Sequence, residues 1–267
     1  MPLAESEWSR RMAHLAMAVI ALIVGVGLGG CCGRTVPGAV VGQPAVARWY
    51  EAELLAFEES DRLSPPAPGQ VLFVGSSSIR LWDSLARDMA PVPVLSRGFG
   101  GSKTGEVLGV FERIVVPYKP CAIVYYCGDN DLGTESTDSA AAAAGFIEFD
   151  RRVHDLWPDV RVLYIAIKPS LARWSNWPAM RRANEIVEAH CAAHSHSEFL
   201  DTATPLLTHD GVPDSRYFQP DGLHLNQAGY EVWRSVIRPR VLRAWEEGGT
   251  SREVSPSPMH IPGARNR

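Results

Sequence analysis

The sequence lacks an excess of basic side chains. Its 26 Lys and Arg residues are outnumbered by 30 Asp and Glu residues, so the formal net charge over 267 residues is -4 at pH 7. Proteins that bind nucleic acid usually carry a basic surface that neutralises phosphates. Nucleic acid is therefore not expected among the partners of this chain.

Cysteine is scarce and is not arranged for metal binding. The chain contains five cysteines, and no two of them form a Cys-x-x-Cys pair or show the spacing of zinc ligands. Cys121 and Cys127 lie on either side of one apolar strand, where two thiols cannot approach closely enough for a disulfide, and we expect both in the core. Cys191 is expected on a helix. Neither a metal nor another cofactor is predicted.

Two common motifs of α/β enzymes are also missing. Lys103-Thr104 follows a glycine-rich stretch, but Ser102 stands where a phosphate-binding loop requires glycine, and the first glycine is misplaced. A Gly-x-Ser-x-Gly nucleophile motif is excluded because Ile79 occupies its last glycine position. Nucleotide binding and an α/β-hydrolase fold are therefore disfavoured. No internal repeat is visible.

The first 31 residues have the pattern of an export signal. A basic pair, Arg10-Arg11, precedes the nearly apolar residues 12–28. The segment then ends in Leu28-Gly29-Gly30-Cys31, which resembles a bacterial lipobox and implies cleavage before Cys31 and lipidation of its thiol. We therefore expect an exported lipoprotein of the bacterial cell envelope, anchored to a membrane on its periplasmic or surface side.

A retained signal-anchor helix is the alternative, because residues 12–32 are about as long as the ~20 residues that cross a bilayer. Residues 32–44 are rich in Gly, Pro and Val and are typical of a linker. Residues 45–247 are expected to form one domain of roughly 200 residues. The tail, residues 248–267, has too few apolar side chains to bury and is expected to be disordered.

Short apolar runs alternate with helical patterns through this domain. Strands are expected near residues 71–74, 92–95, 122–126, 160–167 and 198–200, and helices near 45–62, 79–89, 104–116, 140–156, 179–194 and 227–245. This alternation predicts an α/β fold, a three-layer α/β/α sandwich around a mostly parallel sheet with a flavodoxin-like strand order. The ligand site of such a sheet lies beyond the carboxyl ends of its strands.

Four polar or glycine-rich blocks occur at these strand ends and before the last helix. They are Gly75-Ser76-Ser77, Gly98-Phe99-Gly100-Gly101, Gly128-Asp129-Asn130-Asp131 and Asp221-Gly222-Leu223-His224. In this order the blocks resemble those of the SGNH hydrolases, also called the GDSL esterase/lipase family, over roughly residues 70–242. The run from Val74 to Trp82 resembles the branch in which Gly-Ser-Ser-Ser replaces Gly-Asp-Ser.

The resemblance implies a role for each block. Ser77 would be the nucleophile, and Asp221 with His224 would be the acid-base pair. Gly101, Asn130 and the backbone N–H of Ser77 would form the oxyanion hole. The chemistry is consistent with these roles, because a serine hydroxyl is a weak nucleophile until an imidazole receives its proton and a carboxylate orients that imidazole.

Taken alone, each block has a simpler explanation. The three serines and Asn130 are residue types that often cap helices or form turns. The sequence also departs from the family pattern, since Ser76 replaces the usual acidic residue before the nucleophile and Ser102 stands where an Asp often follows the oxyanion glycine. The three adjacent serines also leave the register open, and Ser77 is the prediction.

The predicted function is that of a serine esterase or acylhydrolase that cleaves a carboxylic ester through an acyl-enzyme intermediate. A lipid, a lysophospholipid or an acetylated carbohydrate could be the substrate. Arg173, Trp174 and Trp177 follow the fourth strand and could line its pocket, although the two tryptophans could equally pack beneath their own loop. The alternative function is a non-catalytic surface lipoprotein that binds a glycan or lipid in the same cleft.

Overall fold

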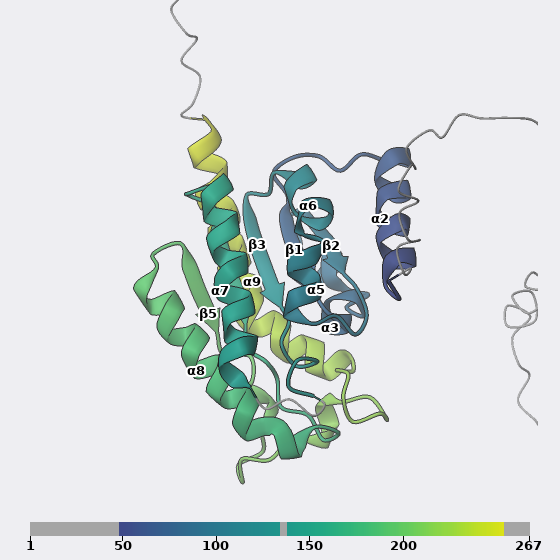
Figure 1. The fold of residues 1–267 in the computed structure, drawn as a ribbon, viewed down its shortest axis with the longest axis vertical. Helices are drawn as coiled ribbons and strands as arrows, with labels where there is room; N and C mark the ends of the chain where they lie inside the picture. The colour runs from purple at the N-terminus through teal and green to yellow at the C-terminus, as the bar shows by residue number, and fades with distance from the viewer. Residues whose placement is uncertain (1–47, 134–137, 254–267) are drawn as a thin grey trace, which may run out of the picture. The chain divides into compact units, whose positions relative to one another are not determined.

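The computed structural model describes residues 48–133 and 138–253 (Figure 1). The expected signal segment with Cys31, the whole expected linker (residues 32–44) and residues 45–47 of the expected domain lie outside the described residues. At their centre is a sheet of five parallel strands in the order β2-β1-β3-β4-β5. The strands are β1 (Val71–Gly75), β2 (Val94–Gly98), β3 (Ala122–Tyr126), β4 (Arg161–Ile165) and β5 (Ser197–Leu200). The predicted α/β fold and flavodoxin-like strand order are confirmed.

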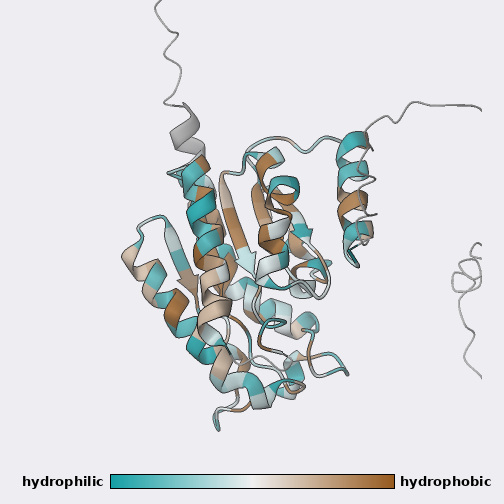
Figure 2. Cartoon of the chain, viewed as in Figure 1, coloured by the Kyte–Doolittle hydropathy of each residue, from teal (hydrophilic) through white to brown (hydrophobic). Residues whose placement is uncertain are grey.

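The central strands are apolar on both faces because helices cover both. Leu72 and Val74 pack into one core layer, and Val71 and Phe73 pack into the other, as the alternation of side chains along a strand requires. Figure 2 shows this apolar centre among more polar helices. Each fully buried large apolar side chain contributes roughly 1.5–3 kcal/mol to the hydrophobic free energy of folding.

Helices from distant parts of the chain form the two outer layers. One layer contains α2 (Glu51–Leu63), α5 (Thr104–Gly109), α6 (Phe111–Ile114), α7 (Ser139–Leu156) and α8 (Trp177–Ala193). The other contains α3 (Ser77–Arg80), α4 (Leu85–Met89) and α9 (Gln227–Glu253), and Figure 1 shows α7 and α9 on opposite sides of the sheet. Short 3-10 turns are η1 (Val116–Tyr118), η2 (Trp174–Asn176), η3 (Thr204–Leu206) and η4 (Ser215–Tyr217).

Two helices that we expected to be continuous are broken. Instead of one helix over residues 79–89, α3 and α4 are separated by a turn, and the carboxylate of Asp88 on α4 accepts hydrogen bonds from Trp82 at 2.9 Å and from Ser84 at 2.5 Å. Local polar side chains of this kind compete with backbone helix bonds. Residues 104–116 break after Gly109, a residue type that weakens helix interiors.

The last helix is longer than expected. It continues to Glu253, past the expected end near residue 245 and into the segment predicted to be a tail. Gly248 lies close to the body of the domain, since a Cβ atom at this position would be 2.9 Å from the Cβ of Cys121. Contact with the domain therefore supports helix where composition alone predicts disorder. The rest of the predicted tail, from residue 254, lies outside the described residues.

The three cysteines of the described region are reduced and buried, which was expected of Cys121 and Cys127. Cys121 and Cys127 lie at the two ends of β3, and Cys191 lies on α8. Within the described residues, no helix combines the length and the apolar character needed to cross a membrane.

Candidate active site

Ser77 lies immediately beyond the carboxyl end of β1, as the first residue of α3. The turn between them depends on Gly75, whose φ of +147° is a backbone conformation that other residues rarely adopt. A Cβ at Gly75 would lie 1.8 Å from the carbonyl oxygen of Tyr126 on the neighbouring strand. The glycine therefore lets the chain turn tightly enough to place Ser77 at the edge of the sheet.

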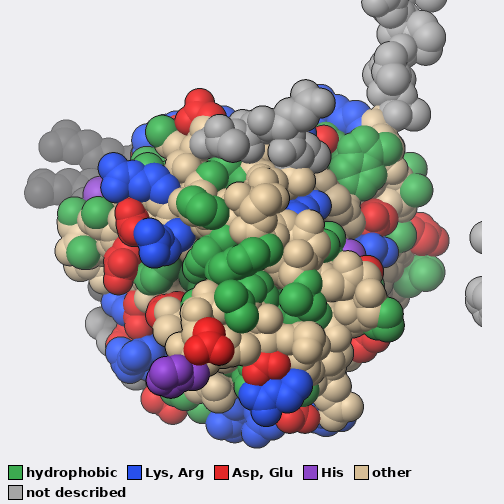
Figure 3. Space-filling view, turned by 90° about the horizontal axis from the view of Figure 1, so that it is seen from below, with side chains coloured by type: hydrophobic (Ala, Val, Ile, Leu, Met, Phe, Trp, Pro, Cys, Tyr) green, Lys and Arg blue, Asp and Glu red, His purple; other side chains and the backbone are tan. Residues whose placement is uncertain are grey.

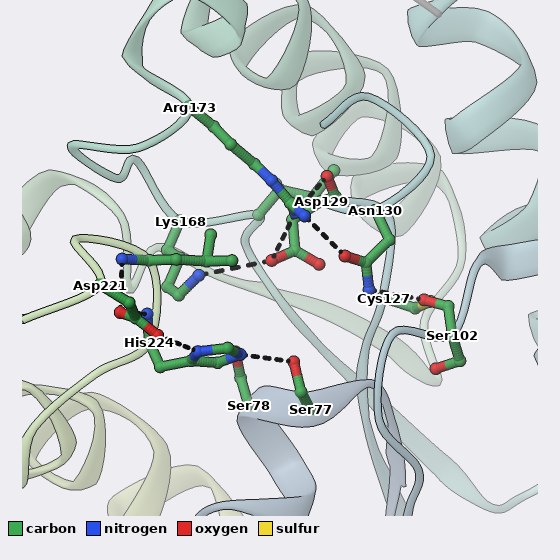
Figure 4. A network of polar contacts seen from close by, with 12 residues as sticks. Ser77, Ser78, Ser102, Cys127, Asp129, Asn130, Lys168, Arg173, Asp221 and His224 are labelled. Atoms are coloured by element: carbon green, nitrogen blue, oxygen red, sulfur yellow. Dashed lines mark hydrogen bonds and ion pairs between the residues drawn. The ribbon is translucent and has the colours of Figure 1, made fainter. Parts of the chain in front are cut away.

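The three adjacent serines have different surroundings. The hydroxyls of Ser76 and Ser78 are buried and have no hydrogen-bond partner among the described residues. The Ser77 Oγ instead lies 3.0 Å from Nε2 of His224, although the two residues are 147 positions apart in the chain (Figure 4). Of the three possible registers, the structure therefore brings the predicted one, Ser77, to the imidazole.

Asp221 and His224 form the other half of this arrangement. The Nδ1 of His224 lies 2.6 Å from Oδ2 of Asp221, and Oδ1 of Asp221 accepts backbone hydrogen bonds from Leu223 at 2.9 Å and His224 at 3.0 Å. Desolvation acts to raise the pKa of Asp221, but the hydrogen bonds from His224 and Leu223 outweigh it and lower that pKa to about 2. The carboxylate therefore stays ionised at neutral pH.

The ionised carboxylate determines which ring nitrogen of His224 can accept a proton. An anion accepts hydrogen bonds only, so the neutral ring carries its proton on Nδ1 and donates it to Asp221. This tautomer leaves Nε2 with a lone pair facing the Ser77 hydroxyl. The arrangement can remove a proton from Ser77 and hold the resulting imidazolium beside a negative charge.

Gly101 lies in the loop after β2, with a φ of +65°. The ring of Trp49 is close to it, 3.1 Å from where a Cβ would stand. The preceding N–H, of Gly100, donates to both carboxylate oxygens of Glu53 on α2 at 3.2 Å. Ser102 is fully buried, and its hydroxyl donates to the carbonyls of Gly75 and Phe99 at 3.3 and 3.2 Å, which ties this loop to β1.

Asn130 lies in the loop after β3 and has both ends of its side-chain amide bound. Its Nδ2 donates to the carbonyl oxygen of Ser102 at 3.0 Å, and its Oδ1 accepts from Nη2 of Arg173 at 3.0 Å. Figure 4 shows the amide nitrogen on the side toward Ser102 and Ser77, with the oxygen facing Arg173. The next residue, Asp131, has a different role, because its carboxylate accepts the N–H and hydroxyl of Thr104 at the start of α5.

A buried group of charges behind Asn130 was missed by the sequence analysis. Asp129 lies 3.4 Å from the ammonium of Lys168 and 3.6 Å from the guanidinium of Arg173. Both Asp129 and Lys168 are buried, and desolvation lowers the pKa of Lys168. Because Asp129 follows β3 and Lys168 follows the adjacent strand β4, two charged residues at neighbouring strand ends were the available signal.

The predicted substrate loop divides into two parts. Arg173 turns inward to Asp129 and Asn130, so its guanidinium is already occupied. Trp174 and Trp177 are half-buried and stack on each other, with ring centroids 6.2 Å apart. Figure 3 views the end of the molecule at which these loops lie and shows apolar side chains gathered near the middle of the face, with charged ones around them.

Two further features of the described residues concern ligands. No group of three or more His, Cys, Asp or Glu side chains within them could hold a metal ion.

A cavity of about 570 Å³ lies at the opposite end of the sheet, lined by residues such as Pro120, Trp157 and His196. It contains none of the predicted site residues.

The sequence was compared with family models and with curated proteins. The model of the GDSL-like lipase/acylhydrolase family matches residues 72–232. No curated protein matches the sequence.

Several solved structures are similar to this chain. A protein of Streptococcus pneumonia, described as a candidate platelet activating factor, has a TM-score of 0.65 at 19% identity, over 72% of this chain and 92% of its own. A candidate acylhydrolase of Bacteroides fragilis has a TM-score of 0.63 at 17% identity, over 74% and 99%. A GDSL-like lipase of Bacteroides thetaiotaomicron has a TM-score of 0.61 at 16% identity, over 72% and 98%. At these identities the likeness is one of fold.

Proposed function

The chain belongs to the GDSL-like lipase/acylhydrolase family and is a serine hydrolase of ester bonds, and from this premise we propose that Ser77, His224 and Asp221 are its catalytic residues. The observation that carries the proposal is the continuous contact from the Ser77 hydroxyl through the His224 ring to the Asp221 carboxylate, at 3.0 and 2.6 Å. These are hydrogen-bond distances between a nucleophile, a base and the group that orients the base.

The reaction proceeds in two halves. Ser77 Oγ attacks the ester carbonyl carbon while its proton passes to Nε2 of His224, and the tetrahedral intermediate then expels the alcohol, which takes that proton. Water attacks the resulting acyl-enzyme, gives a proton to the same Nε2, and releases the carboxylic acid as Ser77 recovers its hydrogen. Asp221 stabilises the imidazolium that forms in each half.

The negative oxygen of each intermediate requires donors fixed in advance. We assign this role to the backbone N–H groups of Ser77 and Gly101 and to the side-chain amide of Asn130. Ser77 is the first residue of α3, where a helix leaves its N–H groups without partners within the helix. The left-handed conformation of Gly101 and the bound amide of Asn130 are consistent with donors that do not have to reorganise during the reaction.

Replacement of Ser77 tests the assignment, with the neighbouring serine as a matched control. We expect Ser77→Ala to abolish hydrolysis of p-nitrophenyl acetate and labelling by a fluorophosphonate probe, because both require an activated hydroxyl. We expect Ser76→Ala to retain both, since the Ser76 hydroxyl has no partner among the described residues. Hydrolysis that survives in Ser77→Ala would refute the assignment. Absence of probe labelling in the wild-type protein would favour the non-catalytic alternative, a protein that binds a glycan or lipid in this cleft.

For the substrate we propose an ester of a lipid, a lysophospholipid or an acetylated carbohydrate. The stacked Trp174 and Trp177 support an apolar or sugar-binding wall, because aromatic faces pack well against both acyl chains and pyranose rings. A panel of esters with acyl chains of increasing length separates these classes. Activity confined to acetyl esters would favour a carbohydrate, and activity that rises with chain length would favour a lipid.

We also propose that residues 1–31 direct export, that Cys31 is lipidated, and that residues 45–247 form the hydrolase domain. The basic pair, the apolar run and the Leu-Gly-Gly-Cys ending support the first two proposals. Mass spectrometry of protein extracted from membranes would detect an acylated N-terminal Cys31. A mature protein that retains Met1 would instead indicate a signal-anchor helix.

A further inference from the structure

An amide side chain stabilises an oxyanion only when its nitrogen faces the site. Asn130 could present either end, because its oxygen and nitrogen exchange places when the terminal torsion turns by half a rotation. With the oxygen toward the intermediate, the amide would repel the developing charge. The activity proposed above therefore requires that something hold Asn130 in one orientation.

The contacts of Asn130 determine this orientation from both ends. Its Oδ1 faces Nη2 of Arg173 at 3.0 Å, and a guanidinium can only donate. Its Nδ2 faces the carbonyl oxygen of Ser102 at 3.0 Å, and a carbonyl can only accept. The reversed amide would place nitrogen against guanidinium and oxygen against carbonyl, so both hydrogen bonds would be lost.

Arg173 is itself held from behind. Its Nη1 donates to the backbone carbonyl of Asp129 at 2.8 Å and lies 3.6 Å from the Asp129 carboxylate. That carboxylate is paired with the fully buried ammonium of Lys168, 3.4 Å away. The planar guanidinium thus binds two successive residues of one loop, which a point charge on a flexible stem cannot do equally well.

We propose that Arg173 is a positioning residue that keeps the amide nitrogen of Asn130 directed toward the carbonyl bound at Ser77. The inference rests on the proposed function of Ser77 and Asn130. It replaces the expectation that Arg173 contacts substrate, since the side chain is largely buried and its guanidinium is occupied by Asp129 and Asn130.

The inference is tested by the kinetics of Arg173→Ala on p-nitrophenyl acetate. Loss of an oxyanion donor lowers turnover ~100 to 1,000-fold, and a donor left free to rotate should lose part of that effect, so we expect kcat to fall at least about tenfold. KM should change little, because the amide interacts most strongly with the intermediate. In an Asn130→Ala background the same substitution should lower kcat by less than about threefold, because the group that Arg173 positions is already gone.

Two controls separate positioning from general damage. Arg173→Lys keeps the positive charge but loses the two-pronged geometry, and we expect an intermediate kcat with an unaltered fold by circular dichroism. Arg113→Ala removes an arginine that also binds two carboxylates, those of Glu51 and Glu58, but belongs to the α2 and α6 region. We expect it to leave kcat unchanged.

Three outcomes would overturn the inference. The first is an unchanged kcat in folded Arg173→Ala. The second is an equal loss of kcat in the wild-type and Asn130→Ala backgrounds. The third concerns the case in which Arg173→Ala does not fold. The inference would then be overturned by an Arg173→Lys variant with the kcat of the wild type. Each presupposes that activity depends on Ser77, so a wild-type protein whose hydrolysis survives Ser77→Ala would refute the proposed function itself.

Discussion

Two loops carry the proposed oxyanion donors beside Ser77, and they are held in different ways. The loop with Gly101 is tied to β1 by the buried hydroxyl of Ser102, and its charged support comes from outside, from Glu53 on α2, whose carboxylate accepts the Gly100 N–H and pairs with Arg80 at 3.5 Å. The loop with Asn130 is held from inside, by Arg173 and the buried charges behind it. One loop depends on partly exposed charges and the other on desolvated ones.

The difference in burial determines how much free energy of unfolding each pair of charges contributes. The side chains of Glu53 and Arg80 are 31% and 46% exposed, so water screens them and holds the pair to roughly 0–1 kcal/mol. Those of Lys168 and Asp129 are 0% and 4% exposed. Removing one partner of a buried pair costs about 3–5 kcal/mol when the remaining charge has no other partner.

The two supports also differ in their relation to the family. Asp129, Lys168 and Arg173 lie within residues 72–232, which the family model matches, whereas α2 lies before them. Of the exposed pair, Glu53 therefore lies outside the matched region and Arg80 lies inside it. The buried support belongs to the sheet itself, because its residues follow the ends of β3 and β4.

The largest effect is expected from the buried pair. Lys168→Met removes the ammonium at similar length and leaves the Asp129 carboxylate buried beside Arg173 alone, so the free energy of unfolding should fall by more than about 1 kcal/mol and by up to about 3–5 kcal/mol, the cost of a buried charge with no partner. Urea denaturation followed by circular dichroism measures this change. Arg80→Ala is the exposed counterpart and should cost less than about 1 kcal/mol. Equal losses in the two variants would remove the distinction between the loops.

The next effect concerns catalysis. Asn130→Ala should lower kcat on p-nitrophenyl acetate ~100 to 1,000-fold, because it removes one donor from the oxyanion site. Asn176→Ala is a matched control, since that amide also donates to a backbone carbonyl, that of Leu132 at 2.8 Å. If Asn130→Ala keeps a kcat within about threefold of the wild type, the loop with Asn130 supplies no oxyanion donor.

A smaller effect is expected from Asp221, which is exposed like Glu53 but bound by several donors like Asp129. Its pKa is lowered to about 2 in the folded protein, so its contribution to stability is complete above its unfolded pKa of ~3.9 and is lost as the pH falls from there toward 2. Because the side chain is 46% exposed, we expect less than about 1 kcal/mol. Thermal unfolding between pH 5 and pH 2 should show this loss in the wild type, and the loss should be smaller in Asp221→Asn.

The smallest effect is expected from a substitution of Glu53, which supports the loop with Gly101. Glu53→Gln keeps an acceptor for the Gly100 N–H while removing the charge that faces Arg80, so stability should change by less than about 1 kcal/mol and kcat by only a few-fold. Steady-state kinetics and urea denaturation measure both quantities. If Glu53→Gln lowers kcat as much as Asn130→Ala does, the partly exposed contact of Glu53 is as important for catalysis as the buried contacts of the loop with Asn130.

Strand positions could be predicted from the sequence more closely than helix boundaries. The ends of the strands were expected to within three residues, because buried parallel strands consist of short apolar runs bounded by polar residues. Helices were less regular than their periodicity suggested. Asp88 broke one by hydrogen bonding to Trp82 and Ser84, and contact with Cys121 extended another past Gly248.

Some contacts of the candidate site could be predicted from the sequence and others could not. Glycine and polar blocks at strand ends indicate where side chains converge. Ser77, Asp221 and His224, which lie together in the structure, could therefore be proposed from the sequence. The contacts of Arg173 could not, because a loop arginine can face substrate or interior equally well. Nothing local distinguishes these two cases.

The sequence by itself determined the parallel α/β fold and the set of residues from which a hydrolytic site could be built, because apolar periodicity and residue chemistry are local properties. Only the tertiary structure decided which of three identical serines meets His224, which end of the Asn130 amide faces Arg173, and that Glu53 reaches Gly100. These contacts join residues 43 to 147 positions apart. They form only when packing brings separate strand ends to one edge of the sheet.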